Sequence, residues 1–433
     1  MAAAQPLTLA IAGLGTVGAA TGALVRNQHE MLELRAGRPV VLRAVSARNR
    51  GKPRGFHMDG VEWFDDPVRM AREAKVDVVV ELIGGADGPA RDVVETALDA
   101  RRHVVTANKA LLAHRGNQLA RKAEGAGLVL AYEAAVAGGI PIIKALREGL
   151  AANNLTRVYG ILNGTCNYIL TTMRESGREF GDVLAEAQRL GYAEADPSFD
   201  VDGVDAAHKL SILAAVAFGV AIDFSALKIE GIRHVSAADI AYADQLGFRI
   251  KLLGIAHMTE AGLEQRVQPC MVPVGSPIAH VDGVFNAVVA EGSSVGMSFY
   301  QGRGAGPGPT ASAVVADIID IARGHKVATF NVPATALEKA HTAPSERHRG
   351  AYYIRLMVVD RPGVIADVAA ALRDEQVSLE SMLQRGRDPD TAVSVVLTTH
   401  ETEEGALQRA LLRISALDTV LEPPRVIRII EAL

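Results

Sequence analysis

The sequence predicts a mixed α/β protein of three parts: a doubly wound parallel sheet, an α+β domain and a small C-terminal α/β sandwich. Three observations predict this. Short apolar runs alternate with helical periods over residues 1–138. Longer mixed segments follow over 139–301. The last 80 or so residues repeat a strand and helix order of their own, which indicates a separate unit.

The first domain begins with LTLAIA at 7–12, an apolar run of strand length, followed by GLGTVG and a helical pattern to about Leu34. Further strands are expected at about 40–46, 77–84, 103–108 and 128–136, with a helix near 90–101. Strands that alternate with helices predict a Rossmann-type parallel sheet, ending at about residue 138.

The pattern of expected helices and strands changes after Gly139. We expect a helix at 141–154, a strand, turn and helix start near 157–170, a long helix at 203–219, and several strands within 247–300. This mixture indicates an α+β domain for substrate binding and dimerisation. A glycine-rich loop and helix at 302–323 is expected to return to the first domain, so that 302–330 completes it.

Residues 331–350 lack periodicity and are interpreted as a linker. Residues 351–433 follow with strand, helix, strand, strand, helix and strand, a ferredoxin-like pattern. The sequence therefore predicts a C-terminal domain that folds around its own core.

The composition excludes several classes of protein. The formal net charge of −5 gives no attraction to nucleic acid or an anionic membrane. Two cysteines, Cys166 and Cys270, exclude a disulfide framework and favour the reducing cytoplasm. The first apolar run is interpreted as a strand and not a signal peptide, and no run reaches the roughly 20 apolar residues that span a bilayer.

A GxGxxG motif stands between the first strand and helix. It consists of Gly13, Leu14, Gly15, Thr16, Val17 and Gly18. The first glycine allows a tight turn, the second lets the backbone approach a pyrophosphate, and the third permits close packing of helix on strand. The motif predicts a dinucleotide site, with an empty glycine turn as the alternative.

The segment after the second strand indicates which dinucleotide binds. An acid there would accept hydrogen bonds from a ribose 2′-hydroxyl. Residues 44–52, AVSARNRGK, contain small residues and cations but no acid. Arg48, Arg50 and Lys52 suit a 2′-phosphate, and Arg48 is the best candidate. We expect a preference for NADP(H), with NAD(H) possible if these are solvated loop cations.

The densest chemistry lies in GYAEADPSFDVDGVDAAHKL at 191–210. Asp205 and Lys209 are four residues apart and share one face of a helix. Lys209 enters an apolar run, so it can be partly desolvated and donate a proton to a carbonyl oxygen. Glu194 and Asp200 suit a cationic amino group. The alternative is a surface ion pair beside an acidic capping loop.

Five segments, in this order, resemble the homoserine dehydrogenase family: GLGTVG, TANKALLA (106–113), EAAVAGGIPII (133–143), ILNGTCNYIL (161–170) and GYAEADPSFDVDGVDAAHKLSIL (191–213). The resemblance covers about residues 7–325, and its last two motifs are highly specific. It implies the reduction of aspartate 4-semialdehyde to homoserine with NADPH, in threonine, methionine and isoleucine biosynthesis.

The resemblance also implies site residues. Lys209 matches the family's acid/base lysine, Asp205 the aspartate beside it, and Lys109 a second active-site lysine. Glu194 and Asp200 match acids that hold the substrate amino group. The remaining positions assigned are Gly164 and Tyr192 for the substrate, and Thr106, Asn108, Lys109 and Gly302 for the cofactor. His208 and Cys166 are interpreted as structural.

The EAAVAGGI segment resembles a family loop that binds a monovalent cation, Na⁺ or K⁺. The resemblance implies oxygen ligands from the backbone carbonyls of Glu133, Val136, Gly138 and Ile140. The alternative is a glycine-rich hinge without a metal.

Residues 351–433 resemble the ACT family, whose members bind amino acids at paired interfaces. The motif is VDRPGVIA, in which Asp360, Gly363 and Val364 are the candidate effector residues. Threonine, the end product, is the effector we expect, and a structural dimerisation module is the alternative. The resemblance implies a homodimer or homotetramer. Another NADP-linked semialdehyde dehydrogenase, or an inactive amino-acid-binding regulator, also stays open.

Overall fold

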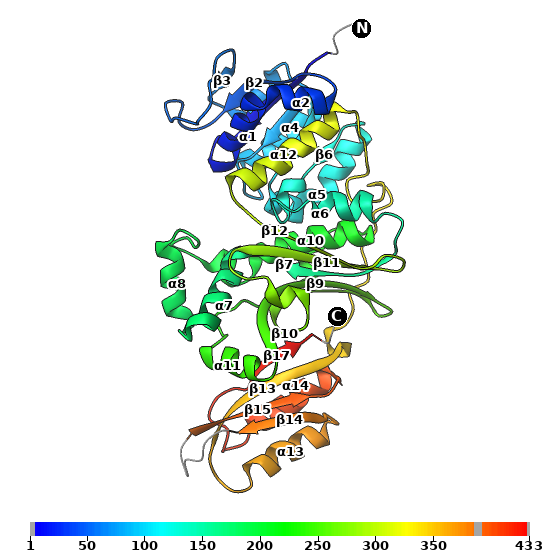
Figure 1. The fold of residues 1–433 in the computed structure, drawn as a ribbon. Helices are drawn as coiled ribbons and strands as arrows, with labels where there is room; N and C mark the ends of the chain where they lie inside the picture. Colours follow the sequence, from blue (N-terminus) through cyan, green and yellow to red (C-terminus); the bar gives the residue numbers. More distant parts are fainter. Residues whose placement is uncertain (1–4, 385–391, 431–433) are drawn as a thin grey trace.

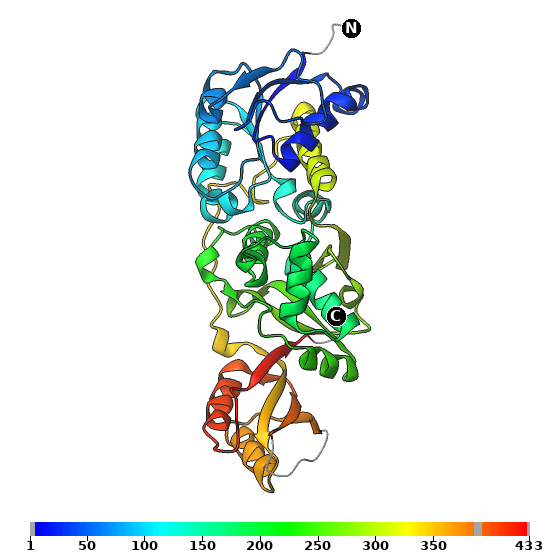
Figure 2. The same cartoon turned by 90° about the vertical axis from the view of Figure 1, so that its left-hand side faces the viewer.

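The computed structural model describes residues 5–384 and 392–430. The chain forms an elongated molecule of three stacked parts, with the N-terminal domain at one end and the C-terminal domain at the other (Figures 1 and 2). The order of the parts in space follows their order in the sequence, apart from one helix that returns to the first part.

The first part contains a six-stranded parallel sheet. Its strands are β1 (Leu7–Ala12), β2 (Val40–Ser46), β3 (Glu62–Phe64), β4 (Val78–Glu81), β5 (His103–Thr106) and β6 (Leu130–Ala131), in the order β3-β2-β1-β4-β5-β6. Every pairing is parallel. The predicted Rossmann-type domain is confirmed, and its strand order reverses between β1 and β4, where such sheets bind ligands.

Helices cover both faces of this sheet: α1 (Thr16–Asn27), α2 (His29–Ala36), α3 (Pro67–Glu73), α4 (Pro89–Asp99), α5 (Lys109–Gly125) and α12 (Pro307–Ala322). The predicted single helix to Leu34 was wrong, because Gln28 leaves the helical conformation and separates α1 from α2. The strand β3 and helix α3 were not predicted. Helix α12 packs beside α1 although about 290 residues separate them in the chain, as expected (Figure 1).

The second part combines helices with a mostly antiparallel sheet, in which only the short β8 pairs in parallel. It contains η1 (Glu133–Ala135), α6 (Ile142–Lys144), the π-helical turn η2 (Ala145–Gly149), β7 (Leu155–Ile161), α7 (Gly164–Ser176), α8 (Phe180–Arg189), α9 (Ser198–Val201), α10 (Val204–Phe218), η3 (Phe224–Ala226), β8 (Lys228–Ile229), α11 (Ala237–Gln245), β9 (Phe248–Thr259), β10 (Gly262–Pro273), η4 (Pro277–His280), β11 (Phe285–Gly292) and β12 (Gly296–Arg303). The predicted helix at 141–154 is shorter than expected, because a π turn at Gly149 ends it.

The third part consists of β13 (Arg349–Val359), α13 (Val364–Asp374), β14 (Leu379–Gln384), β15 (Ala392–Thr399), β16 (Thr402–Glu403), α14 (Glu404–Ser415) and β17 (Arg425–Ile429). The predicted ferredoxin-like order is confirmed. It has its own core, around Ile354, Leu356, Val395 and Ile414.

One sheet of eleven strands runs through the second and third parts. Nine strands follow the order β12-β11-β7-β9-β10-β17-β13-β15-β14, while β8 pairs with β10 and β16 with β13 beside this path. The junction is a parallel pairing in which Cys270 and Met271 of β10 face Arg428 and Ile429 of β17. Figure 1 shows β17 lying along β10. This continuity, which the sequence did not predict, joins the C-terminal domain to the sheet that carries β7.

The segment 331–350 contains the short η5 turn (Ser345–Arg347) and the first two residues of β13, and it lies packed along the molecule. The Glu124 carboxylate accepts bonds from the amides of Thr329 and Ala334. Further along, the amide of Leu263 donates to the carbonyl of His341. The segment therefore connects the first part to the third while being held against the first and the second. Among the described residues, no helix is long and apolar enough to cross a membrane.

Candidate active site

The three glycines of the GxGxxG loop have three different environments. Gly13 has φ of +95°, and a Cβ there would lie 2.6 Å from the carbonyl oxygen of Leu82. A Cβ at Gly15 would meet nothing within 4 Å, so this side of the loop is open. A Cβ at Gly18 would lie 1.9 Å from the Gly13 carbonyl oxygen. The loop therefore fits a pyrophosphate at Gly15, facing the N-terminus of α1.

Beside this loop, the cations after β2 have different partners. Arg54 donates to the carbonyls of Asn49, Arg50 and Lys52, and it lies over the Trp63 ring. Arg50 also lies near that ring. Arg48 is exposed and makes no side-chain hydrogen bond to any residue that the structure describes. Lys52 is likewise exposed and makes no side-chain hydrogen bond to a described residue, so Arg48 and Lys52 are the predicted 2′-phosphate ligands whose side chains are available.

Thr106 and Asn108 lie at the carboxyl end of β5, as predicted, but their side chains form hydrogen bonds to other groups of the protein. Thr106 donates to buried Glu81 at 2.6 Å. Asn108 accepts from the amide of Leu111, which caps α5, and donates to the carbonyl of Gly85. Contacts of these two residues to a cofactor are therefore expected from the backbone and not from the side chains.

Asp205 stands between two lysines. Its Oδ2 lies 2.7 Å from Lys209 Nζ and its Oδ1 lies 3.0 Å from Lys109 Nζ. The side chains of Asp205, Lys209 and Lys109 are 5%, 10% and 33% exposed. Burial raises the pKa of Asp205, but the charges of the lysines outweigh burial, so the pKa lies well below its usual range. The structure thus brings together all three predicted catalytic residues around one ionised carboxylate.

Lys209 Nζ also donates to the carbonyl of Leu162 at 2.7 Å. An ammonium has three donors, so one remains for a substrate oxygen. Leu162 immediately follows β7, and α10 carries Lys209, so a strand end and a helix fix the ammonium together.

Asn163 was missed by the sequence analysis. Its Nδ2 lies 2.8 Å from both Asp200 Oδ1 and Asp205 Oδ2, and its Oδ1 accepts from the amide of Cys166 to cap α7. Burial raises the pKa of Asp200, against the effect of the Asn163 bond. Asn163 therefore joins the candidate substrate acid to the catalytic cluster. The signal available was its position before a helix, typical of a cap.

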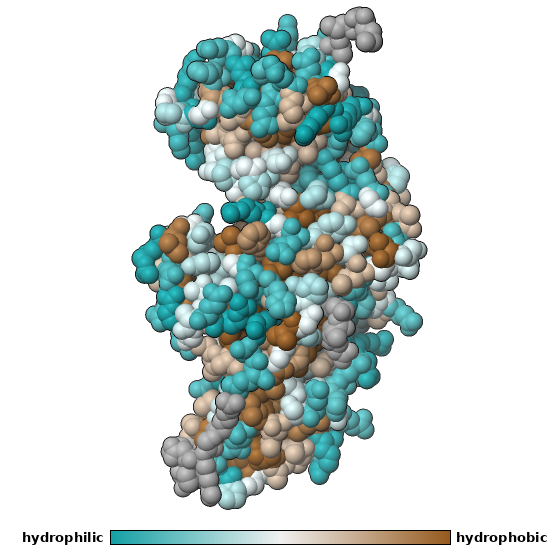
Figure 3. Space-filling view, viewed as in Figure 1, coloured by the Kyte–Doolittle hydropathy of each residue, from teal (hydrophilic) through white to brown (hydrophobic). Residues whose placement is uncertain are grey.

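The other predicted substrate residues are partly or largely exposed. Gly164 begins α7, and a Cβ there would lie 2.8 Å from the carbonyl of Val284. Tyr192 is exposed and packs on the Tyr168 ring at 4.8 Å. Glu194 is exposed, and its carbonyl accepts a bond from Gln188. Figure 3 shows the surface hollowed between the first and second parts of the molecule.

His208 contacts other aromatic rings and forms no hydrogen bond to either lysine. Its Nε2 lies 3.2 Å from that of His114, and the rings of Phe199 and Phe224 pack around it. Burial and the adjacent His114 lower the pKa of His208 to about 4. Cys166 is fully buried, and burial raises the pKa of its thiol well above the usual value. Both observations fit structural roles.

The loop 133–140 is buried and tightly turned. Ala137 and Gly138 both have positive φ, +54° and +41°, which is uncommon for alanine. The carboxylate of Glu133 accepts from the amides of Ile143 and Lys144, so it is not aimed into the loop. Among the described residues no cluster of His, Cys, Asp and Glu could hold a metal. Only the backbone carbonyls of this loop remain as candidate cation ligands.

This loop lies against β11 and β12. A Cβ on Gly302 would lie 3.0 Å from Ile140, and the Gly139 amide donates to the carbonyl of Arg303. Asn286 lies beside them, 1% exposed, and both polar atoms of its amide lack a partner among the described residues. Gly302 therefore belongs to the wall between the first and second parts, and Asn286 is an additional polar group in that wall.

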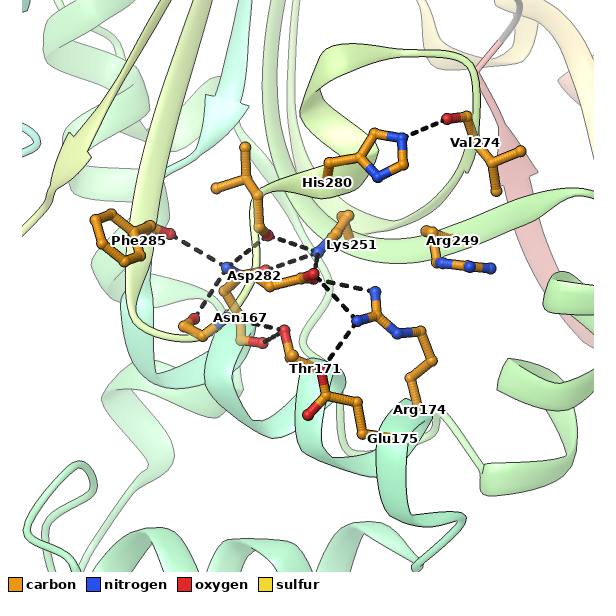
Figure 4. Close-up of polar contacts among 12 residues, drawn as sticks. Asn167, Thr171, Arg174, Glu175, Arg249, Lys251, Val274, His280, Asp282 and Phe285 are labelled. Atoms are coloured by element: carbon orange, nitrogen blue, oxygen red, sulfur yellow. Dashed lines mark hydrogen bonds and ion pairs between the residues drawn. The ribbon is translucent and has the colours of Figure 1, made fainter.

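A buried lysine holds the segment that precedes β11. Lys251 donates to the carbonyl of Val281 and to Asp282, which Arg174 also binds (Figure 4). Asn167 of α7 donates to three carbonyls of the same segment, including that of Phe285. This network fixes the start of α7, and hence Asn163 and Gly164, relative to β11.

In the C-terminal domain, the predicted effector loop connects β13 to α13. Gly363 has φ of +100° and caps α13, and Val364 is buried. Asp360 lies directly after β13. The loop therefore has the predicted strand-to-helix geometry.

The glycine-rich loop of the first part and the buried Lys209 ammonium with one donor free fit an NAD(P)-dependent oxidoreductase that acts on a CH–OH group. Family models narrow this class: "Homoserine dehydrogenase" matches residues 141–319, "Homoserine dehydrogenase, NAD binding domain" matches 13–133, and "ACT domain" matches 352–418. The chain belongs to the homoserine dehydrogenase family.

Individual relatives agree with this assignment. A homoserine dehydrogenase of Neisseria gonorrhoeae is 45% identical, covering 98% of both chains. The crystal structure of a homoserine dehydrogenase from Thiobacillus denitrificans is also 45% identical, covers 98% of both chains and gives a TM-score of 0.93. A hyperthermophilic archaeal homoserine dehydrogenase in complex with NADPH is 27% identical, covers 74% of this chain and 99% of its own, and gives a TM-score of 0.64.

Proposed function

We propose that the chain interconverts L-aspartate 4-semialdehyde and L-homoserine with a preference for NADP(H). The observation that carries this proposal is the Lys209 ammonium, held by Asp205 and Leu162 with one donor left over. The nicotinamide, when bound, donates or accepts the hydride. In reduction, Lys209 donates a proton to the carbonyl oxygen as it becomes an alkoxide, and in oxidation it receives that proton.

The neighbouring groups position the substrate. Asn163 donates to both Asp200 and Asp205, so these two carboxylates are close together. An ammonium bound at Asp200 is therefore close to the proton donor. Glu194 closes the same site from the rim. Lys109 places a second positive charge at Asp205 and is suited to a substrate oxygen. Fixed geometry of this kind supplies a large part of a catalytic rate.

Three finer features belong to the proposal. Arg48 binds a 2′-phosphate, which the NADPH complex of the archaeal relative supports. The carbonyls of Glu133, Val136, Gly138 and Ile140 bind Na⁺ or K⁺, which the two consecutive residues with positive φ support. Threonine binds at the Asp360–Val364 loop and inhibits, in a homodimer or homotetramer. The ACT match supports an amino-acid ligand for that domain.

One assay tests the reaction: homoserine-dependent reduction of NADP, compared with NAD, with and without millimolar threonine. We expect rapid reduction of NADP, slower reduction of NAD, and inhibition by threonine. Absence of any homoserine-dependent rate would contradict the proposal. A rate that is unaffected by threonine would leave the catalytic part intact and remove the regulatory part.

A further inference from the structure

A cavity of about 160 Å³ lies where the second part of the chain meets the C-terminal domain. One wall comes from β7, β9 and β10, and the other from β13, β17 and the turn before β16. A space of this size corresponds to roughly five water molecules at about 30 Å³ each, which is enough for a small metabolite. None of the residues proposed for catalysis, cofactor, cation or threonine lines it.

One side of the cavity carries a surplus of positive charge. Arg266 of β10 and Arg428 of β17 both bond to the same oxygen, Glu404 Oε2. Both guanidinium groups are at least nine-tenths buried, and Nε of Arg428 has no acceptor among the described residues. Glu404 thus bonds to both buried cations, and Glu264 adds only a longer contact, with its Oε2 3.9 Å from Arg266 Nε. A second carboxylate bound here would stabilise both guanidinium groups.

Two further acids line the cavity, one of them close to Arg266. Glu264 accepts a bond from His348 Nδ1 at 2.8 Å. Burial raises the pKa of Glu264, but the bond and charge of His348 outweigh burial, so the net shift is downward and the group is ionised at neutral pH. Glu401 stands at the rim, 2.8 Å from Arg349. These two carboxylates suit a ligand ammonium.

The third feature of the cavity is an apolar wall. Ile255 of β9 lines it from the second part, and Ile429 and Ile430 line it from the C-terminal domain. Burial of an aliphatic group against them is favourable by about 25 cal/mol for each Å² removed from water. An isolated anion such as phosphate would use neither the acids nor this wall.

We propose that this cavity binds a small aliphatic α-amino acid as a zwitterion. Its carboxylate contacts Arg266 and Arg428, its ammonium contacts Glu264 and Glu401, and its side chain packs on the isoleucines. The site is separate from the Asp360–Val364 loop. Because its walls belong to two domains, the bound amino acid holds the junction between them closed.

One strand connects the cavity to the active site. Arg157, which lines the cavity, belongs to β7. That strand ends at Ile161, directly before the Leu162 carbonyl that binds Lys209. A ligand at the junction therefore contacts the same strand that positions the catalytic ammonium.

Isothermal titration of the full chain with L-valine tests the proposal, with isobutyrate and isobutylamine as analogues that lack the ammonium and the carboxylate. We expect saturable binding of L-valine, and binding of each analogue weakened by about tenfold or more, since each loses charge-assisted bonds. Absence of L-valine binding, or equal binding of either analogue, would overturn the proposal.

Three variants locate the site. Glu401→Gln should weaken L-valine binding by about tenfold, while the matched variant Glu403→Gln, two residues away and outside the cavity, should not change it. Asp360→Ala, in the other effector loop, should bind L-valine like the unaltered chain. Loss of binding in Asp360→Ala, or unchanged binding in Glu401→Gln, would place the ligand elsewhere and contradict the proposal.

Hydrogen exchange on the unaltered chain gives a second readout that needs no variant. L-valine should slow exchange of the amides of β17 and of Arg349–Tyr352 in β13. Protection confined to 360–364 would refute the site.

Discussion

Asp205 Oδ2 lies 2.7 Å from Lys209 Nζ, one helical turn further along α10, while its other oxygen binds Lys109. The carboxylate thus fixes two ammonium groups that enter the site from different elements. Because Lys109 begins α5 of the first part and Lys209 belongs to α10 of the second, Asp205 also connects these two parts at the point of chemistry.

Asp205→Asn should lower kcat by about 100-fold, because the amide neutralises the charge that holds both lysines. It should also destabilise the fold by about 3–5 kcal/mol, the usual cost of leaving buried charge unpaired. Steady-state kinetics and urea unfolding measure the two effects. The matched variant Asp202→Asn, which removes a half-exposed carboxylate from the Arg233 ion pair, should change kcat little. Normal kcat in Asp205→Asn would contradict the assigned role.

Asn163 permits a comparison of two substitutions. Asn163→Ala removes both the helix cap and the bonds to Asp200 and Asp205, so it should lose activity and about 1 kcal/mol of stability. Asn163→Asp keeps an acceptor for the cap but places a third carboxylate beside the other two, so kcat/KM for homoserine should fall by at least about tenfold. If Asn163→Asp keeps full kcat/KM, the bridge has no role in positioning the substrate.

His208 should make stability depend on pH. Its pKa in the folded chain is lowered to about 4, below the ordinary value of 6.5. Between these values the unfolded chain binds more protons than the folded chain, so stability falls as the pH falls from about 6.5 to 4, by at most roughly 3 kcal/mol. In His208→Phe, urea unfolding at several pH values should show a smaller slope in this window. Exposed His400→Gln is the control and should keep the slope. An unchanged slope in His208→Phe would disprove the assignment.

Arg48→Ala should raise KM for NADP by about 10- to 100-fold and leave KM for NAD nearly unchanged, since only NADP carries the 2′-phosphate. Arg50→Ala is the matched control, because Arg50 lies at the Trp63 ring and carries the same charge two residues away. Initial rates with both cofactors give the comparison. Equal effects of the two variants would indicate general electrostatic attraction and not a specific ligand.

Much of the fold was predictable because its signals are local. The glycine spacing at 13–18 and the apolar strands identified the first domain, and the last 80 residues showed their own strand and helix order. The pairing of β10 with β17 was not predictable, because no local pattern says which edges of two separate sheets meet. The break at Gln28 was missed since an interrupted helix keeps nearly the same hydrophobic period.

The site residues were likewise predictable only where the signal was local. Asp205 and Lys209 share a helix face, so their spacing predicted their contact. Lys109 lies about 100 residues earlier, and its contact with Asp205 follows only from the packing of α5 on α10. Asn163 had only a capping signal, although in the structure it connects two carboxylates. The cavity at Arg428 was invisible to the sequence because two domains form it.

The measurement that tests the central claim most directly is single-turnover reduction of NADP by homoserine in Lys209→Met, together with the Kd of NADPH measured by fluorescence. We predict a rate at least about 100-fold lower, the usual effect of losing an acid/base group, and a Kd within roughly twofold of the unaltered chain. Lys75→Met, at an exposed position, is the control. A single-turnover rate unchanged by Lys209→Met would show that the buried ammonium does not move the proton.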